Sequence, residues 1–180
     1  MKRTAAMLIG LLLLAFASRA DAQQFEKTMA KLLELEEGGK YREAVAGWQS
    51  FLKTPGLVNN LDKKESQEIY FTAYFHCLRA LHKTALRDPN TRIKDRTKLI
   101  HVAAHMILAL EKAKSKAGWE IVEPLIQEYF KEPETDAFKK EYEKLKGLPA
   151  KESWLPWMQR EVAVHRDVII ESGKRDERRG

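Results

Sequence analysis

The stretch that decides the fold of this 180-residue chain is Gly39-Lys40-Tyr41-Arg42-Glu43-Ala44-Val45-Ala46-Gly47-Trp48-Gln49-Ser50-Phe51-Leu52. A turn glycine precedes a segment whose apolar residues recur at helical spacing. At about 100° per residue, one face of such a helix carries Tyr41, Ala44, Val45, Trp48, Phe51 and Leu52. The small Ala44 lets a neighbouring helix come close, and the large Tyr41 and Trp48 fill the space on either side of it. The segment predicts one half of a helical hairpin that packs on other helices.

This segment, residues 39–52, matches the second helix of a tetratricopeptide repeat at Gly39, Tyr41, Ala44, Trp48 and Leu52. It therefore resembles that family, whose repeats are about 34 residues long. The preceding helix departs from the family's tryptophan, leucine and glycine at Thr28, Lys31 and Leu32. The later helices are divergent, because they lack the Gly-x-Tyr entry. The resemblance implies stacked antiparallel hairpins in a right-handed superhelix, and a protein-interaction scaffold without an activity of its own.

The N-terminus has the pattern of an export signal. Lys2 and Arg3 precede an apolar run over residues 5–17, and Ala20-Asp21-Ala22 supplies the small residues that a signal peptidase reads. We expect residues 1–22 to be removed after Ala22, giving a periplasmic or secreted protein. An uncleaved N-terminal anchor is the alternative. Cleavage would leave 158 residues with 29 basic and 25 acidic side chains, a net charge of about +4.

Apolar periodicity and breaker residues predict six helices, at 24–37, 41–53, 66–87, 95–115, 119–131 and 133–146, followed by a C-terminal helix at 157–171. The fold class is thus all-α, with one tetratricopeptide-like domain over residues 23–147. We expect residues 148–171 to form a tryptophan-containing C-terminal helix or cap, and residues 172–180 a disordered charged tail. The helix at 66–87 is apolar around most of its circumference, apart from a polar strip at Thr72, His76, Arg79 and Lys83. We therefore expect it at the centre of the domain.

Several residues mark the expected ends of these helices. Asp62 and Glu65 have the spacing of a capping box before the third helix, and Asp95 is expected to cap the fourth. Gly118 is expected to break the chain before the fifth helix. Pro124 then marks either the first turn of that helix or a kink in it.

The most suggestive pair of metal ligands is His101 and His105, which stand one helical turn apart. Val102 occupies the position that holds the glutamate in H-E-x-x-H metalloproteases, so no general base is supplied. The two imidazoles are expected to point away from the packed face, beside Lys98 and Lys112. Because two ammonium groups oppose a cation and a structural zinc needs four ligands, we expect no metal here.

Cys77 follows His76, a neighbourhood that invites a nucleophile. Adjacent residues of a helix point about 100° apart, so the two side chains do not face each other. Cys77 falls among apolar residues, where a cysteine behaves as a small hydrophobic residue with a raised pKa. A role in the core is the expectation.

Trp154 and Trp157, with Leu155 and Met158, form an apolar patch between two prolines. One interpretation is a lid that covers the last hairpin, since the end of a repeat stack needs a cap. The other is a docking surface, because tryptophan and methionine are enriched at interfaces. Both interpretations stay open at the level of sequence.

These patterns predict an exported scaffold that binds another protein and is not an enzyme. No phosphate loop, nucleophile elbow or dinucleotide fingerprint occurs, so no catalytic residue, metal or cofactor is assigned. Export and the lack of a basic, aromatic stripe argue against nucleic acid as a partner. The alternative is a small ligand or metal carrier with a pocket around Tyr70, Tyr74 and His76.

Overall fold

The computed structural model describes residues 19–112 and 116–147, and in this part of the chain every regular element is helical. In chain order the elements are α2 (Arg19–Glu37), α3 (Tyr41–Phe51), α4 (Pro55–Val58), α5 (Lys64–Arg87), α6 (Ile93–Lys112), α7 (Lys116–Tyr129), the 3₁₀ turn η1 (Pro133–Thr135) and α8 (Asp136–Lys146). The predicted all-α class is confirmed, and neighbouring helices pack on one another. None of these described helices is long and apolar enough to span a bilayer.

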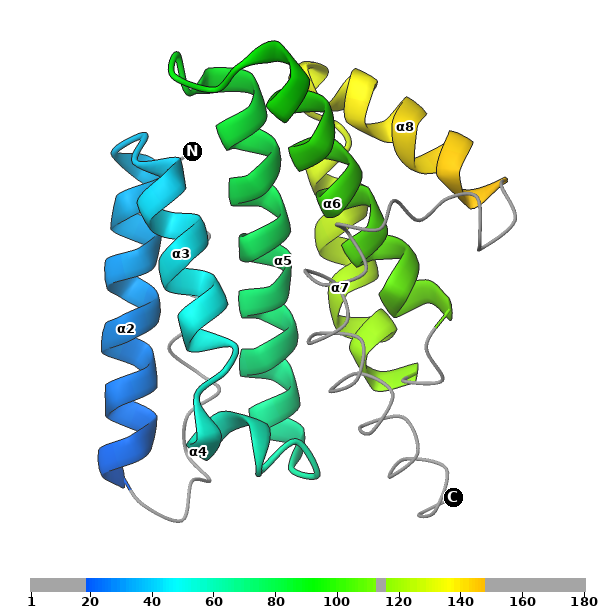
Figure 1. The fold of residues 1–180 in the computed structure, drawn as a ribbon. Helices are drawn as coiled ribbons and strands as arrows, with labels where there is room; N and C mark the ends of the chain where they lie inside the picture. The colour runs from blue at the N-terminus through cyan, green and yellow to red at the C-terminus, as the bar shows by residue number, and fades with distance from the viewer. Residues whose placement is uncertain (1–18, 113–115, 148–180) are drawn as a thin grey trace.

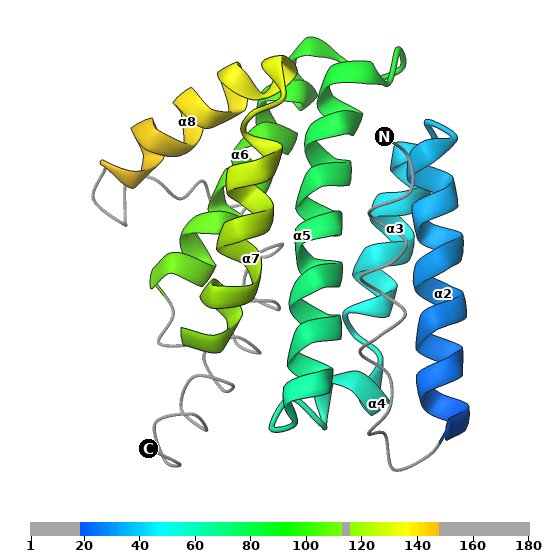
Figure 2. The ribbon, with the colours of Figure 1, turned by 180° about the vertical axis from the view of Figure 1, so that it is seen from behind.

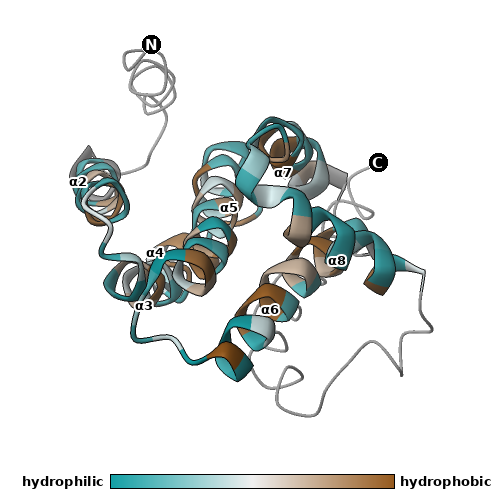
Figure 3. Ribbon diagram, turned by 90° about the horizontal axis from the view of Figure 1, so that it is seen from above, coloured by the Kyte–Doolittle hydropathy of each residue, from teal (hydrophilic) through white to brown (hydrophobic). Residues whose placement is uncertain are grey.

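The helices form two layers, with α5 near the middle (Figures 1 and 2). α5 packs on α3, α6 and α7, while α2 packs on α3 and α8 packs on α6. Seen from above, α2, α5 and α7 lie along one side and α3 and α6 along the other (Figure 3). We call the first side the α2/α5/α7 face.

The central position of α5 follows from its composition. Its buried side chains come from most of its circumference: Tyr70, Phe71, Ala73, Tyr74, Phe75, Cys77, Leu78, Ala80 and Leu81. A helix that is apolar on so many sides must be covered by several neighbours. The remaining side carries Thr72, His76, Arg79 and Lys83, which are partly exposed. The structure thus confirms both the predicted centre of the domain and its polar strip, which we call the α5 strip.

The hairpin of α2 and α3 closes as the sequence predicts. Gly39 has φ +74°, a conformation that residues with a Cβ rarely adopt. The N–H groups of Gly39 and Lys40 donate to the carbonyls of Glu36 (3.0 Å) and Leu35 (2.8 Å), the paired bonds of a Schellman C-cap. Downstream, Ala44, Trp48 and Leu52 are buried against the core.

Some predicted helix boundaries are wrong. α5 begins at Lys64 and is preceded by Lys63 without a side-chain cap, so Asp62 is not its N-cap. α6 begins at Ile93, which places Asp95 inside the first turn. The connection predicted to be irregular contains α4, because Pro55 suits the first position of a helix. Pro124 lies inside α7, well past its first turn.

Gly118 also differs from its prediction, because it lies within α7 and does not break the chain. A Cβ at this position would lie 2.6 Å from Cζ of Phe71. The glycine therefore allows α7 to approach the aromatic ring on α5. Its role is close packing, and the local sequence alone gives no sign of the ring that faces it.

Other predictions fall outside the described residues. These are the apolar part of the signal peptide, the Trp154 and Trp157 patch, the helix at 157–171 and the tail at 172–180. The predicted cleavage motif, Ala20-Asp21-Ala22, lies in the first turn of α2.

Ala44 is fully buried, and this packing can be tested by enlarging it. We expect Ala44→Trp to lower the free energy of unfolding by about 1–3 kcal/mol or more, because the added ring overpacks a close helix contact. Ala46→Trp is the matched control, since Ala46 is exposed on the same helix. Its effect should stay within about 0.5 kcal/mol in urea unfolding. Equal effects of the two variants would contradict the packing described.

Candidate protein-interaction surface

The α5 strip lies toward the α2/α5/α7 face, because Arg79 pairs with Glu36 of α2 and Lys83 pairs with Glu132, just after α7. Figure 2 shows α5 between α2 and α7. The charged members of the strip, Arg79 and Lys83, are partly exposed. Its cations pair with acidic residues on both sides, namely Glu36 of α2 and Glu132 and Glu134 near η1. The strip thus connects three helices by charge as well as by packing.

On the α2 side, four side chains form a compact group that we call the Glu36 cluster: Glu36, Trp48, His76 and Arg79. Trp48 Nε1 donates to Glu36 Oε1 at 2.7 Å. Arg79 donates to Glu36 Oε2 through Nε at 2.9 Å and through Nη2 at 2.7 Å. The His76 ring stacks on Trp48, with centroids 5.2 Å apart and Nδ1 3.4 Å from Glu36 Oε1. The Glu36 side chain is only 5% exposed, so these contacts compensate a charge removed from water.

The contacts of this cluster set its protonation. Burial works to raise the pKa of Glu36, but the contact with His76 and the charge of Arg79 outweigh it and hold the pKa below its ordinary value. Burial lowers the pKa of His76, although the neighbouring Glu36 opposes that shift. At neutral pH the cluster therefore holds one carboxylate, one guanidinium and an uncharged imidazole.

On the α7 side, Lys83 pairs with Glu132 at 2.9 Å and also with Glu134, which Arg87 contacts in turn. The Lys83 ammonium lies 5.4 Å from the centroid of the Tyr129 ring, within cation–π range. These contacts connect the α5 strip to α7 and to the acidic residues that follow it.

Beneath the strip, the Tyr129 hydroxyl lies 2.8 Å from Nδ1 of His82, and the His82 ring stacks on Phe138 at 4.6 Å. His82 is fully buried, and burial lowers its pKa to about 4. The sequence pattern did not single out this histidine, since its partners stand far along the chain.

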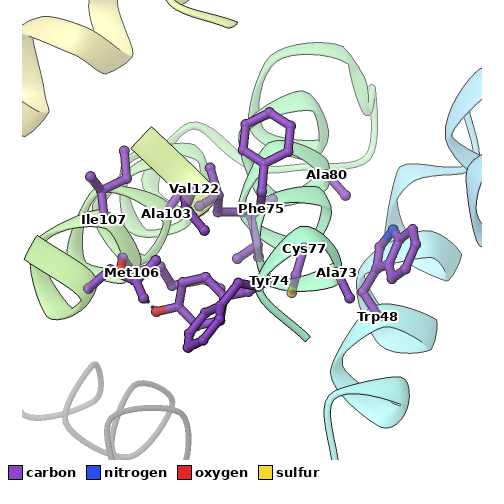
Figure 4. Close-up of a cluster of buried hydrophobic side chains, with 14 of the residues drawn as sticks. Trp48, Ala73, Tyr74, Phe75, Cys77, Ala80, Ala103, Met106, Ile107 and Val122 are labelled. Carbon is purple, nitrogen blue, oxygen red and sulfur yellow. Dashed lines mark hydrogen bonds between the residues drawn. The ribbon is translucent and has the colours of Figure 1, made fainter. Parts of the chain in front are cut away.

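Cys77 lies beside the strip on α5, among buried apolar side chains. Figure 4 shows Ala73 between Cys77 and Trp48. Burial raises the pKa of the Cys77 thiol to about 12, so it stays protonated at neutral pH. The expected core position of this cysteine agrees with the structure.

The two candidate metal ligands on α6 occupy different environments. His105 is fully buried, so the prediction that it points away from the packed face is wrong. Residues 102–110 of α6 are all buried, so this half of the helix is covered on every side and has no single packed face. His101 is partly exposed, with Nε2 3.4 Å from Oε1 of Glu141. Within residues 19–112 and 116–147, no three potential ligands of the His, Cys, Asp and Glu types come together.

The carrier alternative places a ligand pocket around Tyr70 and Tyr74. Both side chains are fully buried parts of the core. Their rings stack at 6.4 Å, and the Tyr74 hydroxyl donates to the carbonyl of Met106 at 2.9 Å. They therefore connect α5 to α6.

A cavity that the sequence analysis missed lies between α2 and α3. Its volume is about 440 Å³, and its lining includes Phe25, Leu32, Leu35, Gly47 and Phe51. Gly47 allows α2 and α3 to approach each other beside this cavity, because a Cβ at residue 47 would lie 2.2 Å from Cδ2 of Leu32. Helical periodicity predicts which face of a helix is packed, but it does not show the space that remains beside the packed side chains.

Comparisons with protein-family models, curated proteins and solved structures find no match for the chain. The fold and this surface define it as an all-α protein of packed helical hairpins.

The buried carboxylate of Glu36 gives a direct test of the cluster. We expect Glu36→Ala to lower the free energy of unfolding by about 3–5 kcal/mol, because it leaves the Arg79 charge and the Trp48 N–H without their partner. Glu34→Ala is the matched control on the exposed side of α2 and should change stability by less than about 0.5 kcal/mol. Urea unfolding at pH 7 measures both. A Glu36→Ala protein as stable as Glu34→Ala would refute the role assigned to Glu36.

His82 predicts an acid-dependent loss of stability. Its pKa is lowered from 6.5 to about 4 on folding, so below pH 6.5 the unfolded chain binds a proton that the folded chain does not. Stability should therefore fall as pH drops from about 6.5 to about 4, by up to about 3 kcal/mol from this residue. Urea unfolding at a series of pH values measures the slope. His82→Gln should flatten it, and a variant with the unchanged slope would contradict the assignment.

Proposed function

We propose that this chain is an exported, non-catalytic helical scaffold that binds another protein on the α2/α5/α7 face. The observation that carries the proposal is the α5 strip, a partly exposed row of polar side chains on the central helix, flanked by two further helices. Binding residues on rigid helices suit a scaffold, because their positions are fixed before the partner arrives.

Three further features support the proposal. The N-terminal pattern of Lys2, Arg3 and Ala20-Asp21-Ala22 is typical of export. The segment at residues 39–52 resembles a family of interaction scaffolds. Its matching residues Ala44, Trp48 and Leu52 are buried, so their roles are structural and the partner is left to the exposed side of the helices.

A photo-crosslinking amino acid placed at Thr72 tests this function in the producing cells. Thr72 is a partly exposed member of the α5 strip. We expect Thr72 to yield one dominant protein adduct, identified by mass spectrometry, and the matched position Ala46 in the other layer to yield none. Thr72→Arg should then abolish binding of the identified partner while the circular dichroism spectrum is unchanged. Equal adducts from both positions, or none from Thr72, would count against the α2/α5/α7 face.

The second candidate function is that of a small-ligand carrier, and the cavity between α2 and α3 favours it. Its volume of about 440 Å³ lies within the range of small-molecule sites. Its lining combines apolar side chains with the polar Thr28 and Ser50. Native mass spectrometry of the purified protein distinguishes the two functions, since a carrier would retain a bound small molecule.

A further inference from the structure

The Glu36 cluster holds two titratable groups that sense acid, Glu36 and His76, where α2, α3 and α5 meet. In the neutral state the carboxylate of Glu36 offsets the guanidinium of Arg79, which binds it through two N–H groups. Both oxygens of the carboxylate are already engaged, because Oε1 accepts from Trp48. A proton added to His76 would thus place a second cation beside one shared carboxylate.

The groups that face His76 from each neighbouring element define this charge balance. From α2 comes Glu36 and from α3 the uncharged Trp48, while α5 contributes Arg79 and, nearby, Cys77. On the α7 side Tyr129 packs against Phe75, the neighbour of His76. Burial raises the pKa values of Cys77 and Tyr129, so both stay neutral under acidic conditions. Glu36 is the carboxylate in contact with both cations.

Protonation of either His76 or Glu36 therefore gives the cluster a net positive charge. A proton on His76 leaves a net charge of about +1, and a further proton on Glu36 leaves about +2. The His76 side chain is 13% exposed and that of Glu36 5% exposed, so water cannot compensate the excess charge well. The lowered pKa of His76 agrees with this reluctance to accept a proton in the packed state.

We propose that the Glu36 cluster is an acid-sensitive contact that releases the α2–α3 hairpin from α5 as the pH falls below neutral. Once α3 moves away, His76 leaves its stack on Trp48 and takes up its proton in water. The packing of α5 with α6 and α7, and of α6 with α8, contains no member of the cluster outside α5 and is retained.

Cys77 reports such a release, because it is the single cysteine of the chain and is fully buried on α5, separated from Trp48 of α3 by Ala73 (Figure 4). The experiment measures labelling of Cys77 by 4,4′-dithiodipyridine between pH 7.5 and pH 5. Each rate is divided by that of the urea-unfolded chain at the same pH, which removes the intrinsic reactivity of the thiol. We expect the normalised rate to rise about tenfold, because uptake of one proton on release can shift the release equilibrium by up to about tenfold per pH unit. The helical circular dichroism signal should stay unchanged.

Three variants identify the group responsible. His76→Gln should abolish the rise, and Glu36→Gln should raise the rate already at pH 7.5. Glu132→Gln is the matched control, since it removes a carboxylate that pairs with the α5 strip on the α7 side, and it should keep the original profile. A flat profile in the unmodified protein, an unchanged rise in His76→Gln, or a loss of helical signal that parallels labelling would overturn the proposal.

Discussion

The packing of α2, α3 and α5 depends on the hydrogen bonds and the ion pair that compensate the buried carboxylate of Glu36. Glu36 stands near the end of α2 and accepts hydrogen bonds from Trp48 of α3 and Arg79 of α5. A charge taken out of water is tolerated only where such partners surround it. Because α2 packs mainly on α3, this contact is the charged connection between α2 and the central helix. It also satisfies the Trp48 N–H, which would otherwise be a buried donor without an acceptor. The registers of α2, α3 and α5 are thus fixed together.

Around this contact, helix spacing is set by positions without a bulky side chain. Gly47 admits Leu32 of α2, and Gly118 admits the ring of Phe71. In both places a methyl group would collide with the facing side chain, because protein interiors have little free volume. Gly118 thus allows α7 to cover α5 closely, and Gly47 allows α3 to pack closely on α2. Small residues determine how near the helices come, and aromatic residues then fill the spaces between them.

The sequence was sufficient for the helices and for the side of α5 that faces water, because both follow from the period of apolar residues. It was insufficient where a role depends on a distant partner. Glu36 stands in the stretch Glu34-Leu35-Glu36-Glu37, a pattern typical of a solvated face, and nothing local indicates Arg79, 43 residues away. Gly118 suggested a break because glycine usually ends helices. The spacing of apolar residues predicts one packed face for α6 and places His105 away from it, but residues 102–110 are buried on every side.

These contacts also constrain how the α5 strip could bind a partner. Arg79 and Lys83 already have acidic partners within the chain, so a bound protein would share or replace those ion pairs and gain little net energy from charge. Affinity would then come from desolvating the neutral parts of the face, such as the side of α5 around Ile69 and Thr72. The charged groups would chiefly set the orientation of the bound partner. They would disfavour partners whose charges do not complement the cations of the strip and the acidic residues beside them. If the α5 strip binds a protein, selection would therefore rest mainly on shape, which the internal ion pairs hold in place at neutral pH.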